Sequence, residues 1–126
     1  RIFVLFTGYC KTFSTQNEGQ YDTIGAFWDQ MSARFGRENL RGLGFGWKQN
    51  TIEYCIGLRE GDIGPALEVD GAVYRQVSLP DEGWLSYTGK TDELPLLYDE
   101  IYRDGALLYE IELFWEDGGC QILIYR

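Results

Sequence analysis

Histidine is absent from the 126 residues of this sequence. The absence excludes Ser-His-Asp and Cys-His nucleophile pairs, imidazole acid–base chemistry at neutral pH and most zinc sites. No apolar run approaches the roughly 18 residues of a membrane span. We therefore expect a protein that holds no metal or cofactor and does not insert into a membrane.

Cysteine is scarce, and its spacing carries little signal. The three cysteines, Cys10, Cys55 and Cys120, are far apart, odd in number and without a C-x-x-C motif. Neither a disulfide framework nor a thiolate metal site is indicated by this spacing. We predict three reduced core residues, which are typical of a cytoplasmic protein.

Positively charged residues are also few. Eleven Lys and Arg stand against twenty Asp and Glu, which gives a net charge of −9. Such a surface repels phosphate backbones and anionic lipids and favours cationic partners, so we expect no direct binding to nucleic acid or membranes. Hydrophobic residues make up 44% of the chain and aromatic residues 16%, which predicts one folded domain over residues 1–126.

The apolar residues that are present form two similar helical stripes. One follows Asp22 and the other follows Asp92, and Gly36 and Gly105 stand where the two helices should end. An Asp at a helix start can cap open amides, and a Gly suits the residue after the helix. The stripes comprise Ile24, Phe27, Trp28, Met31 and Phe35, then Leu94, Leu97, Tyr98 and Ile101.

Each predicted helix is followed by a hairpin with alternating apolar residues and is preceded by a strand-like run. The runs cover residues 2–13 and 72–88, the second broken at Pro80. The predicted fold is α+β, with two β-α-β-β units related by a pseudo-twofold axis, an antiparallel sheet and two main helices. The units cover about 1–58 and 72–126, joined by 59–71. A groove between such halves is an ordinary ligand site.

Strand alternation separates the second hairpin into two faces. Ile111, Leu113 and Trp115 are assigned to the face under the helix, so Glu110, Glu112 and Phe114 point to the opposite one. The equivalent positions of the first hairpin are Gly42, Gly44 and Gly46, which we interpret as making space, as allowing close approach of another backbone, or as both. A carboxylate beside aromatic rings is costly unless it is paired or solvated, but it suits a large organic cation.

Four short segments resemble the GyrI-like small-molecule-binding domain, the effector module of AraC-type and MerR-type multidrug regulators, which also occurs free-standing. The free-standing acidic form is similar to integron cassette proteins that bind cationic drugs. The resemblance covers essentially all 126 residues. Its segments are Ile24-Gly25-Ala26-Phe27-Trp28, Tyr54-Cys55-Ile56-Gly57-Leu58, Leu79-Pro80-Asp81-Glu82-Gly83-Trp84 and Glu112-Leu113-Phe114.

The resemblance implies a pocket between the repeats for bulky lipophilic cations, with a glutamate as charge partner. That role is carried to Glu112, which precedes Phe114 by two, and the family tyrosine maps to Tyr54. Our register instead puts Tyr54 on the helix side, away from Glu112, so register and resemblance disagree there. The candidate ligand-binding residues are Glu112, Phe114, Trp84, Trp28, Tyr54, Glu110 and Tyr87.

The resemblance, together with the charge of −9, implies three possible functions. The leading expectation is a non-enzymatic binding protein for lipophilic cations, without a DNA-binding domain of its own. An alternative is a small hydrolase of electrophilic ring compounds with Glu112 as general base, which requires a tyrosine hydroxyl within reach of Glu112. A third is an acidic inhibitor of a DNA-processing protein. The sequence leaves a homodimer open.

Overall fold

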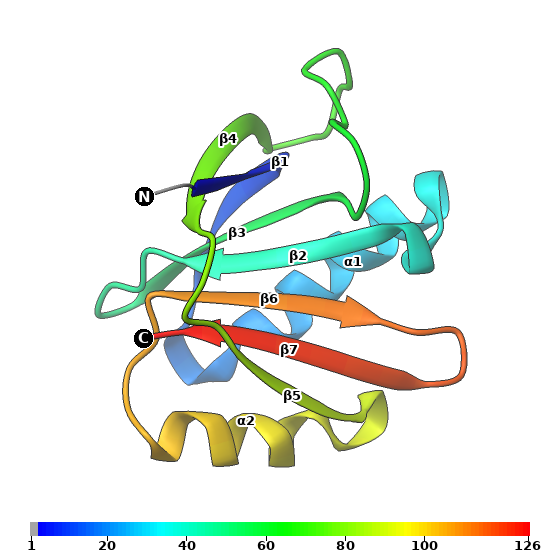
Figure 1. Ribbon diagram of the computed structural model, residues 1–126. Coiled ribbons are helices and arrows are strands. Elements are labelled where there is room, and N and C mark those ends of the chain that lie inside the picture. Colours follow the sequence, from blue (N-terminus) through cyan, green and yellow to red (C-terminus); the bar gives the residue numbers. More distant parts are fainter. Residues whose placement is uncertain (1–2) are drawn as a thin grey trace.

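A computed structural model describes residues 3–126 as a seven-stranded antiparallel sheet with two helices on one face (Figure 1). The α+β class with an antiparallel sheet and two main helices is thus confirmed. The strands are β1 (Phe3–Ser14), β2 (Leu40–Phe45), β3 (Thr51–Leu58), β4 (Val73–Pro80), β5 (Leu85–Lys90), β6 (Tyr109–Phe114) and β7 (Gly119–Tyr125). The helices are α1 (Gln20–Phe35) and α2 (Leu94–Arg103), with short 3₁₀ turns at Gln16–Glu18, Arg37–Asn39 and Thr91–Glu93.

The strands run in the order β4-β1-β3-β2-β6-β7-β5. The sequence run 72–88 is therefore two strands at opposite edges of the sheet, and the segment after Pro80 crosses from one edge to the other (Figure 1). The pair β2·β6 lies at the centre, where the two halves of the chain meet. The pseudo-twofold relation between the halves stays a prediction, and the first two residues of the first unit lie outside the described residues.

The two helices end near the predicted residues, but they begin differently. Gly36 and Gly105 follow α1 and α2 with φ of +81° and +123°, a conformation in which glycine is favoured. The prediction of aspartate caps is wrong. The N-cap residues of α1 and α2 are Gly19 and Glu93, and neither helix has a side-chain hydrogen bond at its N-terminus. Asp22 lies inside the first turn of α1 instead. No helix within residues 3–126 is long and apolar enough to cross a membrane.

The face assignment for the second hairpin is wrong. Glu110, Glu112 and Phe114 face the helices, whereas Leu43 and Ile111 belong to the cluster on the opposite face. Alternation shows which residues share a face, but both faces of this sheet are rich in apolar residues, so it does not show which one the helices cover. Trp115, which was assigned to the face under the helix, is not packed there, because its side chain is 43% exposed.

A disulfide on the opposite face corrects the cysteine prediction. Cys10 of β1 and Cys55 of β3 are direct register partners and are bonded to each other, and Cys120 is the free buried thiol. Strand pairing brings together two residues that are 45 apart in sequence, which their spacing alone does not reveal. The argument from reduced cysteines, on which the cytoplasmic prediction rested, is thereby removed.

The disulfide can be checked by counting thiols. In denaturant without reductant, we expect one reactive thiol per chain, from Cys120, and three after reduction, measured with a chromogenic thiol reagent. Three thiols before reduction would show that Cys10 and Cys55 are not bonded.

The close approach of β1 and β3 yields a second prediction. A Cβ at Gly57 would clash with the backbone carbonyl oxygen of Thr7, whereas a Cβ at Gly25 on α1 meets no atom within 4 Å. Gly57→Ala should therefore lower the free energy of unfolding by about 1–3 kcal/mol. Gly25→Ala should raise it by roughly 0.5–1 kcal/mol, because alanine is the better helix former. Urea unfolding measures both, and equal effects would contradict the described packing.

Candidate functional site

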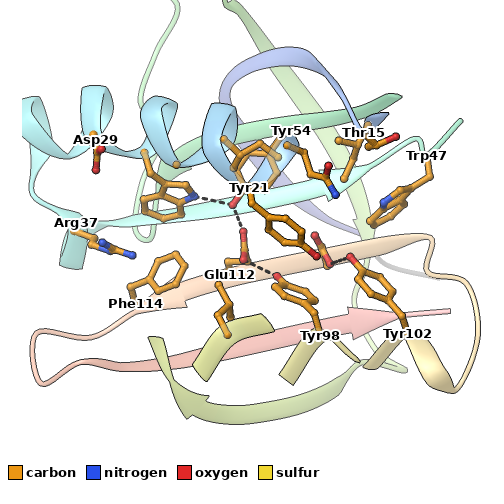
Figure 2. Close-up of a pocket in the computed structure, with 17 residues that line it drawn as sticks. Thr15, Tyr21, Asp29, Arg37, Trp47, Tyr54, Tyr98, Tyr102, Glu112 and Phe114 are labelled. Atoms are coloured by element: carbon orange, nitrogen blue, oxygen red, sulfur yellow. Dashed lines mark hydrogen bonds between the residues drawn. The ribbon is translucent and has the colours of Figure 1, made fainter. Parts of the chain in front are cut away.

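A cavity of about 230 Å³ lies between the two helices and the central strand pair β2·β6 (Figure 2). Seven of its seventeen lining residues are aromatic, and the lining comes from both helices and from strands of both halves of the chain. The lining residues are Thr15, Gln20, Tyr21, Ile24, Gly25, Trp28, Asp29, Arg37, Trp47, Ile52, Tyr54, Leu94, Tyr98, Tyr102, Glu110, Glu112 and Phe114.

Two carboxylates stand on the floor of this cavity. Glu110 and Glu112 alternate along β6, so both point to the same face, and they are only 5% and 6% exposed. Neither forms an ion pair: within residues 3–126 the one salt bridge joins Arg75 and Glu53. Isolated carboxylates are costly to bury, so this pair is the strongest chemical feature of the molecule.

Glycines on the neighbouring strand make room for these acids and their partners. Gly42 of β2 is opposite Glu112, and Gly44 is opposite Glu110. A Cβ at Gly42 would clash with the Tyr54 hydroxyl, and one at Gly44 would lie 2.9 Å from both Cγ and Oε1 of Glu110. The interpretation that these two glycines provide space is confirmed.

Glu112 is held by a hydrogen-bonded network from four elements. The Tyr54 hydroxyl donates to Glu112 Oε1, and the Tyr98 hydroxyl donates to Oε2 over 2.5 Å. Trp28 Nε1 donates to the Tyr54 oxygen over 2.8 Å (Figure 2). Tyr54 therefore lies on the helix side, as the register predicted, and Glu112 lies there with it, so both oxygens of Glu112 have a tyrosine donor.

Glu110 has fewer partners than Glu112. The Tyr102 hydroxyl donates to Glu110 Oε2 over 3.1 Å, and the Tyr102 ring is stacked on that of Tyr98 at 5.5 Å between centroids. Among the described residues, Glu110 Oε1 has no hydrogen-bond donor. A further acceptor, Gln20 Oε1, is buried in the cavity wall and also lacks a partner within residues 3–126.

Burial controls the titration of these groups. It raises the pKa of Glu110, and the neighbouring Glu112 raises it further, against a smaller lowering by the Tyr102 hydrogen bond. Burial also raises the pKa of Glu112, which the bonds from Tyr54 and Tyr98 and the charge of Arg37 oppose. The pKa values of Tyr54 and Tyr98 are far above the ordinary value, chiefly through burial. Both tyrosines therefore remain protonated donors at neutral pH.

Five of the seven sequence candidates meet in the cavity, namely Glu112, Phe114, Trp28, Tyr54 and Glu110. The other two do not line it. Trp84 packs on the opposite face of the sheet, where its ring lies 5.6 Å from that of Tyr125 and its Nε1 donates to the carbonyl of Pro80. Tyr87 packs on the cluster between α2 and β7.

Several lining residues were missed by the sequence analysis. Tyr98 lies on the predicted apolar stripe of α2, and Tyr102 is one helical turn beyond it, so their spacing placed both on one face without showing that their hydroxyls meet carboxylates. Trp47 packs against the core clusters on the helix side of the sheet and also lines the cavity. Nothing in the sequence pattern singled out Gln20 or Arg37.

Comparisons with protein-family models, curated proteins and solved structures find no match for this chain. The GyrI-like resemblance therefore rests on the sequence segments that carry it, and what it implies about function enters below as a proposal.

The burial of Glu110 predicts an unusual dependence of stability on pH. Its folded-state pKa is raised, so the folded protein binds more protons than the unfolded chain above pH 4.5, and stability falls as pH rises toward the folded pKa. Glu110→Gln removes the titrating carboxyl group and therefore removes this loss of stability. The variant should gain stability relative to the native protein as pH rises above 4.5, by at most about 1.4 kcal/mol per pH unit. Urea unfolding at several pH values measures the difference.

Glu53→Gln is the matched control, because Glu53 is paired with Arg75 on the opposite face of the sheet. A Glu110→Gln difference that is independent of pH, or that shrinks as pH rises, would contradict the raised pKa.

Proposed function

We propose that this protein binds lipophilic organic cations in the cavity between α1 and α2. The observation that carries the proposal is the pair of buried carboxylates, Glu110 and Glu112, which face an aromatic cavity and lack an ion-pair partner within residues 3–126. A bound cation supplies the missing positive charge, so the protein does not have to bury a cationic side chain of its own beside the carboxylates.

The cavity walls suit the organic part of such a guest. Seven of the lining residues are aromatic: Tyr21, Trp28, Trp47, Tyr54, Tyr98, Tyr102 and Phe114. Ring faces attract cations within about 6 Å, and the attraction strengthens when water is excluded. Apolar and aromatic walls with a few placed polar groups are what small-molecule pockets share.

The volume indicates the size of a suitable probe. About 230 Å³ lies below the roughly 300–1,000 Å³ of drug-sized pockets, so a two-ring cation is a better first probe than a large dye. Binding of bulkier compounds, as the GyrI-like resemblance implies, then requires them to extend past the half-exposed Tyr21 and Tyr102.

One observation favours the hydrolase as a second candidate. A tyrosine hydroxyl within reach of Glu112 is the feature that this reading requires, and Tyr54 supplies it. Against it, both carboxylate oxygens of Glu112 already accept tyrosine hydrogen bonds, which weakens the carboxylate as a base toward water. Binding without catalysis therefore remains the first proposal.

The test is a pair of probes with nearly the same shape, N-methylquinolinium and neutral 1-methylnaphthalene. Trp28 and Trp47 line the cavity, so tryptophan fluorescence should report occupancy. We expect saturable quenching by the cation at micromolar concentration, about 8 kcal/mol of binding free energy, and at least tenfold weaker binding of the neutral compound. The double variant Glu110→Gln, Glu112→Gln should lose the preference.

Glu53→Gln again serves as the control and should keep the preference for the cation. Equal affinity of the native protein for both probes, or a preference that survives the double variant, would rule out a charge-selective cavity.

A further inference from the structure

The cavity is electrostatically uneven along its length. The Arg37 guanidinium lies 4.2 Å from the centroid of the Phe114 ring and 5.9 Å from that of Trp28. In Figure 2, Arg37 and Phe114 lie at one end, Tyr102 and Trp47 lie at the other, and Glu112 stands between them. A cationic guest is repelled by Arg37, the one cation among the lining residues that the structure describes, so its charge belongs at the Tyr102 end.

The carboxylate at that end is Glu110. It is bonded to Tyr102, and Glu112 rather than Glu110 experiences the charge of Arg37. The two acids also differ in hydrogen bonding, because Glu112 has a tyrosine donor on each oxygen whereas Oε1 of Glu110 has none among the described residues. Glu110 can therefore accept a hydrogen bond from a guest at Oε1, whereas both oxygens of Glu112 already have tyrosine donors.

The cavity contains a second acceptor without a donor, the side-chain carbonyl of Gln20 at the start of α1. Buried acceptors without a hydrogen-bond donor are uncommon, because leaving a buried polar atom without a hydrogen bond costs free energy. The cavity wall thus holds one buried oxygen without a donor, Gln20 Oε1, and one carboxylate oxygen, Glu110 Oε1, that accepts no hydrogen bond from the described residues. A quaternary cation brings charge but no such donor, whereas a protonated amine or an amidinium brings both.

We infer that the guest is a cation with N–H donors, a protonated amine or an amidinium, whose charged group is held by Glu110. The inference rests on the proposed function and narrows its substrate class. Gln20 is the additional acceptor for the same class of guest. Glu112 is a positioning residue, whose role is to hold Tyr54 and Tyr98 in place as walls of the cavity. The resemblance gives the role of charge partner to Glu112, whereas this inference gives it to Glu110.

The test compares 1-naphthylmethylammonium with its N,N,N-trimethyl derivative, which keeps the charge and removes every N–H. Calorimetric titration of the native protein should show at least tenfold tighter binding of the primary ammonium, the effect of one charge-assisted hydrogen bond. In Glu110→Gln this ratio should fall toward one. The trimethyl group is larger than the primary ammonium in both proteins, so its size affects both ratios equally. The difference between the ratios therefore measures the effect of the hydrogen bond to Glu110.

Two further variants complete the design. Glu112→Gln should weaken both cations by a similar factor and leave their ratio unchanged. Gln20→Leu, at a half-buried position on the first turn of α1, should lower the ratio and keeps the inference testable should a β6 variant fail to fold.

The outcomes distinguish the two proposals. Tight binding of both cations with a ratio near one, or a ratio that is lost in Glu112→Gln and kept in Glu110→Gln, overturns this inference and leaves the cation pocket intact. Binding of neither cation more tightly than neutral 1-methylnaphthalene overturns the proposed function itself.

Discussion

The burial of two carboxylates on one strand, without an ion-pair partner anywhere in residues 3–126, is the constraint on which the site depends. Glu110 and Glu112 lie under two helices at the centre of the sheet, where an unpaired charge is costly. Three tyrosine hydroxyls compensate in part by donating hydrogen bonds, and they come from β3 and α2. The tyrosines supply no positive charge, and the cationic guest that we propose would supply it.

The neighbouring strand makes this arrangement sterically feasible. Gly42 and Gly44 lie directly across from Glu112 and Glu110, and side chains there would collide with Tyr54 and with Glu110 itself. Glycines weaken a strand, since they lose more conformational freedom on folding and pack nothing. Here that cost is the condition for fitting a tyrosine and two acids between the sheet and the helices. Stability and the site are therefore in direct competition along β2 and β6.

The sequence was sufficient to predict the α+β class, the two helices and the hairpin after each of them, because periodicity and alternation are local properties of the chain. It could not assign the faces of β6, since apolar residues line both sides of the sheet. Contacts between distant residues were also out of reach. Cys10 meets Cys55 only through the register of β1 and β3. Trp84 lies in the segment that crosses from one edge of the sheet to the other, where its ring is 6.2 Å from that of Tyr109 on the face opposite the helices.

The glycines open space, the tyrosines hold Glu112, and Glu110 keeps an oxygen without a donor among the described residues, which is where we propose that the guest binds. The most direct test is a crystal structure of the protein with 1-naphthylmethylammonium bound. The account predicts the naphthyl ring inside the aromatic cavity and the ammonium nitrogen within about 3 Å of Glu110, a charge-assisted hydrogen-bond distance. An empty cavity with the ligand bound elsewhere, or an ammonium directed at solvent, would contradict it.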